Sequence, residues 1–270
     1  MKIILDIGTS FIKWVLIQEN LQGSKKLTYK SIRLELDNGG FSKPEFYDQL
    51  RHKLTTIRET IPGLITSLHC LLPSAFFDWK LEAGRLIPVP FDSLLTDMNS
   101  ILDDCNLEAS FLGACLNAEV TAIQKLLPEF EGVLISGGQA EIIYTYIQNS
   151  QIQNIVRTNA IITRDLEQYW QTTSKNRAID SHMLPMGSAR QYMRLPAPLQ
   201  RLFETLLPNL AWQKNILLTG GTFDIYGFCE MLEWRTRSQC AFLARQLGEN
   251  DPMSPSHSVY TPLYSHFLVA

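Results

Sequence analysis

The sequence predicts an α/β protein made of two related halves, each a mixed β-sheet flanked by helices. Short apolar segments with strand character are followed directly by glycine turns at three places. One order of elements (strand, glycine turn, strand, turn, strand, helix) occurs twice, about 130 residues apart, which indicates two homologous halves. The chain is 45% hydrophobic and 19% charged, as expected of a globular protein with a substantial core.

Charge and hydropathy exclude several classes of function. The formal net charge is −3, so no strong global field favours nucleic acid or an anionic membrane. No apolar run approaches the roughly 20 residues needed to span a bilayer. The first residues lead straight into a strand segment, without the pattern of a signal peptide. We therefore expect a cytoplasmic protein that has no nucleic-acid partner and no direct membrane span.

The first half opens with three segments of strand character and continues with a helix and a further strand. β-branched and aromatic residues favour strands, and the helix has apolar residues spaced along one face. The predicted elements are strands at 2–5, 11–18 and 27–36, a break at 37–40, a helix at 44–60 and a strand at 65–72.

The next stretch is bounded by prolines and is predicted as an inserted subdomain at about 73–112. It contains an extended segment at 76–90, an amphipathic helix at 91–106 and a strand at 110–112. A helix at 117–127 closes the first half, which we assign to residues 1–128. The second half, residues 129–270, is shorter, and we expect it to be trimmed.

The second half repeats the opening order. A strand at 133–135 leads into a glycine turn at 136–139, strands at 141–148 and 151–159, and a helix that begins at Thr163. A third glycine turn follows a strand at 216–218 and precedes a helix at 223–233. The segment 248–262 is predicted as loop, and 263–270 as a short strand or helix.

Glycine turns at strand ends can bind phosphate groups. Glycine permits a positive φ and the close approach of a ligand, and successive backbone N–H groups form a concave anion site. Each turn alone is consistent with an ordinary hairpin. Three such turns in this order indicate a nucleotide-type cleft between the halves.

The three turns also carry a family resemblance. Asp6-Ile7-Gly8-Thr9-Ser10-Phe11-Ile12-Lys13 resembles the first phosphate motif of actin-like proteins, the superfamily of actin, Hsp70 and sugar kinases. The segment 134–139 resembles the second phosphate motif, and 216–222 with 226–228 resembles the adenosine motif. Val156-Arg157-Thr158 and Leu72-Pro73-Ser74 are similar to segments of the FtsA/PilM branch.

The resemblance implies ATP and Mg²⁺ as ligands. Asp6 would hold the metal, because hard carboxylate oxygens suit Mg²⁺. The implied nucleotide-binding residues are Asp6, Gly8, Thr9, Ser10, Lys13, Gly137, Gly138, Gly220, Gly221 and Thr222.

One departure bears on catalysis. The second phosphate motif usually begins with an Asp that positions metal and water, and we align Ile135 with that position. A hydrocarbon side chain can do neither job, so we assign no catalytic residue. We expect weak nucleotide binding or none, and very slow hydrolysis or none. Glu141 is a candidate substitute acid, and whether the chain is an enzyme stays open.

Similarity to PilM implies an assembly protein of a pilus or secretion machine. Such a protein binds the short tail of an inner-membrane partner and is peripheral to that membrane through it. Our candidate peptide-binding residues are Phe76, Phe77, Trp79 and Leu81, which a buried strand pair would explain equally well. Two alternatives remain: a small-molecule kinase of the same fold, and a self-associating, filament-forming ATPase of segregation or division.

Overall fold

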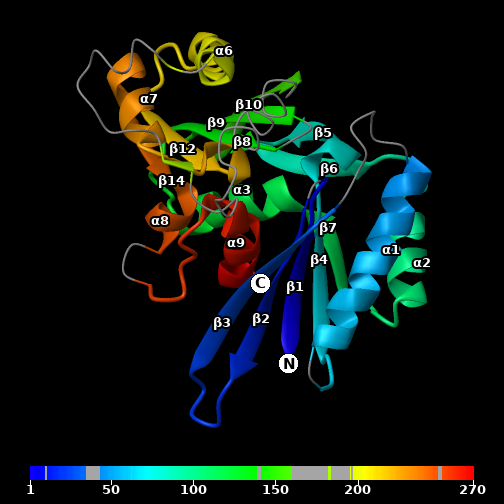
Figure 1. Cartoon of the computed structure of the whole chain (residues 1–270). Coiled ribbons are helices and arrows are strands. Elements are labelled where there is room, and N and C mark those ends of the chain that lie inside the picture. The colour runs from blue at the N-terminus through cyan, green and yellow to red at the C-terminus, as the bar shows by residue number, and fades with distance from the viewer. Residues whose placement is uncertain are drawn as a thin grey trace.

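The protein is described by a computed structural model covering residues 1–9, 11–34, 43–61, 63–138, 141–159, 182–183, 195, 197–248 and 251–270. The main architecture is two five-stranded sheets with helices on both faces (Figure 1). The α/β class predicted from the sequence is confirmed. Ser10, the break at 37–40, Gln139 and the helix expected from Thr163 lie outside the described residues.

The first sheet has the order β3-β2-β1-β4-β7. β1, β2 and β3 are antiparallel neighbours, whereas β4 and β7 run parallel to β1. β1 is apolar almost throughout because both of its faces are covered. The strands are β1 (Lys2–Ile7), β2 (Phe11–Glu19), β3 (Lys25–Arg33), β4 (Ser67–Leu72) and β7 (Phe111–Ala114).

The second sheet has the order β10-β9-β8-β12-β14 and repeats the directions of the first. β8, β9 and β10 are antiparallel neighbours, and β12 and β14 run parallel to β8. The two halves therefore share one sheet topology, in agreement with the order of elements that recurs in the sequence. The strands are β8 (Gly132–Gly137), β9 (Glu141–Gln148), β10 (Gln151–Asn159), β12 (Asn215–Thr219) and β14 (Gln239–Phe242).

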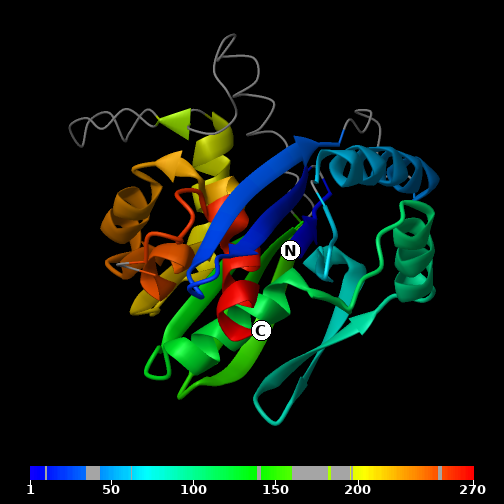
Figure 2. The same ribbon diagram turned by 90° about the horizontal axis from the view of Figure 1, so that it is seen from below.

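Two helices, α3 (Cys115–Leu126) and α9 (Thr261–Val269), pack side by side between the sheets (Figure 2). Ala118 of α3 and Leu263 of α9 join the inner core of the first sheet. Leu116 and Val120 of α3 face the opposite way, into the inner core of the second sheet. α3 therefore couples the halves as well as connecting them in sequence.

Other helices cover the outer faces. α1 and α2 close a core over the first sheet, and α6 and α7 close another over the second. A short pair, β11 (His182–Met183) and β13 (Ile225–Tyr226), lies apart from both large sheets. The helices are α1 (Lys43–Thr60), α2 (Leu94–Asp104), α6 (Ala197–Leu206), α7 (Phe228–Thr236) and α8 (Leu243–Leu247).

Between β4 and β7 the chain forms a hairpin of β5 (Phe77–Glu82) and β6 (Arg85–Pro90), followed by α2. Ala83 and Gly84 both have positive φ, as a tight two-residue hairpin turn requires. The hairpin extends as a two-stranded arm (Figure 2). The Ile152 N–H donates to the Gly84 carbonyl at 2.9 Å, so the arm reaches β10 of the second half.

Several segments differ from the sequence-based expectation. The helix expected at 223–233 begins only at Phe228, because a 3-10 turn and β13 precede it. β14 and α8 were not predicted, and the chain end is helical. None of the helices in the described part of the chain is long and apolar enough to cross a membrane.

Candidate functional site

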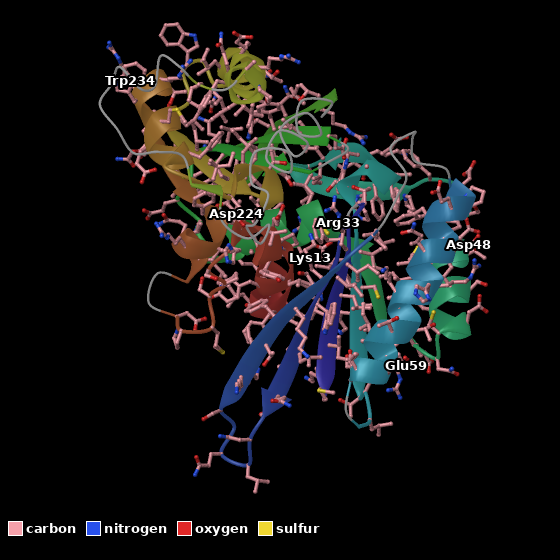
Figure 3. The ribbon with its side chains drawn as sticks, in the orientation of Figure 1. Lys13, Arg33, Asp48, Glu59, Asp224 and Trp234 are labelled. Carbon is pink, nitrogen blue, oxygen red and sulfur yellow. The ribbon has the colours of Figure 1, made fainter. Side chains whose placement is uncertain are left out.

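The centre of the candidate site is a buried ion pair between Asp6 and Lys13. The two residues are register partners on β1 and β2, so their side chains lie on the same face of the sheet. Lys13 Nζ lies 2.5 Å from Asp6 Oδ2, and the Asp6 side chain is 2% exposed. Burial is the largest influence and opposes the positive charge of Lys13, but Asp6, Cys115 and Glu119 together outweigh it, and the pKa of Lys13 is raised. Figure 3 places Lys13 near the middle of the molecule.

α3 adds two further groups to this pair. The Cys115 thiol donates to Asp6 Oδ1 at 3.3 Å. Glu119, one turn later, is 1% exposed and accepts a hydrogen bond from Thr219 Oγ1 at 2.5 Å. Burial raises the pKa of Glu119 to about 8, Thr219 and Ser136 oppose that rise, and the nearby Asp6 carboxylate adds to it. Glu119 is therefore largely neutral at pH 7.

The sequence reasoning did not single out Glu119, Cys115, Ser136 or Thr219. The available signal was the position of Glu119 on the apolar face of the helix, three residues after Leu116 and four before Ile123. An acid on the apolar face of a packed helix is buried and needs a polar partner.

Comparison of the two halves shows that Ile135 does not occupy the position of the motif Asp. Asp6 pairs with Lys13 in the first half, and Ser136 pairs with Ile143 at the corresponding register of the second. The turns agree as well: the Gly8 N–H donates to the Phe11 carbonyl at 2.9 Å, and the Gly138 N–H donates to the Glu141 carbonyl at 3.0 Å.

Ile135 lies instead in the outer core of the second sheet. The residue equivalent to Asp6 is therefore Ser136, and the second half supplies a hydroxyl group at that position rather than a carboxylate.

The second and third glycine turns pack against each other. Gly220 has φ +90°, and a Cβ there would lie 2.1 Å from the Gly137 carbonyl oxygen. A Cβ on Gly137 would in turn meet the Phe223 ring and Thr222 Cβ. Since Ser136 and Thr219 are register partners that precede these glycines, both turns start beside Glu119.

A third segment covers the Gly220 turn. Asp224 accepts hydrogen bonds from the backbone N–H groups of Ser258 and Val259. The Ser258 hydroxyl donates to the Gly220 carbonyl at 2.8 Å, and a Cβ on Gly221 would lie 3.2 Å from Val259. Val259 thus lies beside Gly221, one of the residues implied above to bind nucleotide.

The described residues do not fit a magnesium ion held by Asp6. A cation, Lys13, already lies on one carboxylate oxygen, and a thiol donates to the other. Mg²⁺ binds through carboxylate oxygens and retained waters, which need both charge and space. No group of three or more metal-ligating side chains occurs among residues whose positions are described. Of the predicted phosphate contacts, Gly8, Thr9 and Gly138 lie in the two hairpin turns.

Glu141 does not replace the missing acid. Its Oε2 atom accepts from Arg157 Nε at 2.8 Å and pairs with Arg157 Nη2 at 2.7 Å. Burial raises the pKa of Glu141, and Arg157 opposes the rise. The same Arg157 donates to the Phe77 carbonyl at 3.1 Å, which ties β10 to the hairpin arm.

The four candidate peptide-binding residues differ in exposure. Phe77 is 3% exposed in the first-half core, and Phe76 and Trp79 are partly buried against it. Leu81 is 41% exposed. Four further apolar side chains of the inserted segment are exposed: Ile87, Phe91, Leu95 and, on β7 at its end, Phe111.

No family model matches the sequence, and no curated protein matches it at the sequence level. Solved structures match its fold. PilM in a PilM–PilN type IV pilus biogenesis complex matches with TM-score 0.64 and 11% identity, covering 99% of this chain and 98% of that one. The ethanolamine utilization protein EutJ from Carboxydothermus hydrogenoformans matches with TM-score 0.57 and 13% identity, covering 100% and 89%. MreB 5 of Spiroplasma citri, bound to AMPPNP, gives 0.56 and 9%, covering 99% and 95%.

Proposed function

We propose that this chain, which has the fold of the actin-like ATPases, is an assembly protein that binds a membrane partner's peptide and does not turn over ATP. The machine would be a pilus or secretion apparatus, and the partner segment would be the cytoplasmic tail of an inner-membrane protein. The observation that carries the proposal is the charge balance of the central site, where Lys13 neutralises Asp6 and Ser136 takes the second carboxylate position.

With Asp6 neutralised by Lys13, the described residues of the central site lack the free carboxylate that ATP hydrolysis needs. Phosphoryl transfer depends on positioned metal ions and charges, because the protein contributes little covalent chemistry. Here Asp6 is bound to an internal cation, and Glu119 is largely neutral at pH 7 and bonded to Thr219. Nucleotide binding, if any, would use Lys13 and the hairpin turns and would be weak.

Peptide binding is supported by the match to PilM in its complex with PilN, which spans nearly the full length of both chains. The inserted segment adds exposed apolar side chains on the hairpin and at the start of α2, namely Leu81, Ile87, Phe91 and Leu95. Apolar pockets beside strand edges are a recurring mode of peptide recognition.

One observation favours a second candidate, slow ATP hydrolysis with Glu119 as the base. A carboxyl group whose pKa is about 8 lies near the range in which general bases work best. Glu119 is 1% exposed and one of its oxygens is bonded to Thr219, so we rank this candidate second.

The test of the proposal is peptide binding measured by fluorescence polarisation. The probes are labelled cytoplasmic segments of single-span membrane proteins from the same genome, and the comparison is between the intact chain and Phe91→Glu. We expect one segment to bind and Phe91→Glu to weaken it about tenfold, the effect of removing one buried aromatic contact. Leu64→Glu, a change at an exposed leucine outside the segment, is the matched control. Equal binding by all three chains would contradict the assignment.

A further inference from the structure

Trp212 is an exposed tryptophan in an unfavourable backbone conformation. It lies in the turn 210–213 between α6 and β12, which the Gln213 N–H closes by donating to the Leu210 carbonyl at 3.1 Å. Trp212 is the third residue of this turn and has φ +71°. Glycine or asparagine is favoured at that position, and a bulky side chain there is an outlier.

Packing does not compensate for this strain, because Trp212 is 98% exposed. Neither the backbone preference nor the core therefore accounts for a tryptophan here. Strained, exposed side chains of this kind are associated with functional sites, and the inference runs from the observed outlier to the function.

Two exposed cations lie on the segments that meet at the turn of Trp212. Lys214 follows it in the chain, and Arg237 lies on the neighbouring segment after α7; both are exposed. The two segments are joined because Ser238 Oγ donates to the Gln213 carbonyl at 2.6 Å and the Gln239 N–H donates to the Lys214 carbonyl at 2.8 Å. Trp234, labelled in Figure 3, is 61% exposed on α7, one turn before Arg237.

The adjoining helices carry three acids: Glu230 of α7 is exposed, and the other two accept hydrogen bonds from neighbouring groups. Glu233 of α7 accepts the Cys240 N–H at 2.9 Å, towards β14. Glu204 of α6 accepts from Gln200 on its own helix. Trp212 thus lies on a turn whose adjoining segments carry the exposed cations Lys214 and Arg237, and we call these three residues the tryptophan tip.

We propose that the tryptophan tip contacts an anionic lipid bilayer directly. Tryptophan partitions to the headgroup region of a bilayer, where its amphipathic ring is most stable. Lysine and arginine beside it gain from the negative surface potential of anionic lipids. A single ring that projects from a turn can enter the headgroup region of a bilayer, whereas the binding of a peptide needs a groove on the protein.

This inference goes beyond the proposed function, because it needs no protein partner. The contact would orient the second half towards the membrane while the inserted segment of the first half binds its peptide. A single ring and two charges give weak, salt-sensitive and reversible attachment, which a second, protein-mediated attachment would reinforce.

The test is co-sedimentation of the intact chain with phosphatidylglycerol vesicles, and with phosphatidylcholine vesicles for comparison. We expect binding to the former only, lost at high salt. Trp212→Gly should lower the partition coefficient about tenfold, as expected for loss of one inserted aromatic ring. Since glycine relieves the positive φ, the same variant should unfold at a higher temperature than the wild type, so lost binding would not reflect misfolding.

Leu21→Ser is the matched control, because Leu21 is also fully exposed in a turn but has no place in the tip. Lys214→Glu with Arg237→Glu should abolish the preference for phosphatidylglycerol. Absence of wild-type binding, or unchanged binding by Trp212→Gly, would overturn the proposal. A Trp212→Gly variant that keeps vesicle binding but loses a protein partner would also overturn it, in favour of a protein contact.

Discussion

Replacing Glu119 by glutamine tests the electrostatic description of the central site. Glutamine keeps the size of the side chain and an oxygen that can accept from Thr219, but it cannot ionise. In the folded protein burial raises the pKa of Glu119 to about 8, against an ordinary value of 4.5. Between these values the folded chain keeps a proton that the unfolded chain releases, so the folding stability of the wild type falls as the pH rises.

The size of the effect follows from the same two values. At about 1.4 kcal/mol for each pH unit, the interval from 4.5 to about 8 corresponds to about 5 kcal/mol of unfolding free energy. The variant does not incur this loss. The unfolding free energy of Glu119→Gln minus that of the wild type should therefore rise by about 3 to 5 kcal/mol between about pH 5 and pH 8.5.

The assay is urea unfolding of both chains at several pH values, with the slope checked for two-state behaviour. Glu129→Gln, at an exposed position before β8, is the control and should follow the wild type at every pH. If the difference between Glu119→Gln and the wild type stays constant with pH, Glu119 is ionised in the folded protein and the description of a neutral site is wrong.

Three further predictions follow. Lys13→Met should cost about 3 to 5 kcal/mol in urea unfolding, because it leaves the Asp6 charge buried and unpaired, and adding Asp6→Asn should recover most of that loss. His69 Nδ1 and His266 Nε2 are 2.7 Å apart, and burial lowers the pKa of His266 to about 4. Since the unfolded chain binds this proton more readily, about 3 kcal/mol of stability should be lost as the pH falls from 6.5 to 4, a loss that His266→Gln should lack. Arg157→Ala should speed hydrogen exchange in the 77–90 hairpin measured by mass spectrometry, because it removes the bond to the Phe77 carbonyl; unchanged exchange would mean that the arm is held by other contacts.

The sequence predicts the main architecture because its strongest signals are local. Apolar strands that end in glycine, such as 2–8 and 132–138, mark the two equivalent hairpins, and the structure gives them the same register. Glycine at position 220 is required by φ +90° and by the contact with the Gly137 carbonyl, and the sequence pattern located that turn.

Register and burial were harder to predict. Ile135 and Ser136 are neighbours in one strand, and a shift of one residue moves a side chain to the opposite face of the sheet. Matching the glycines of the two turns does not show whether Ile135 or Ser136 faces Glu119. The role of Glu119 depends on Lys13 and Thr219, which lie about a hundred residues away on either side, so no local pattern reveals it. For Phe77 the sequence left peptide binding and a buried strand pair equally open, and packing against the first-half core buries it.

The most direct test of the central claim is phosphate release from Mg-ATP by the intact chain at neutral pH. The charge balance of Asp6, Lys13 and Ser136 predicts release at the rate of the buffer alone, with the same result for Glu119→Gln. Turnover faster than about one per second corresponds to a barrier that only an assembled catalytic site can reach. Turnover at that rate in the wild type, abolished in Glu119→Gln, would contradict the claim and identify Glu119 as the base of an active ATPase.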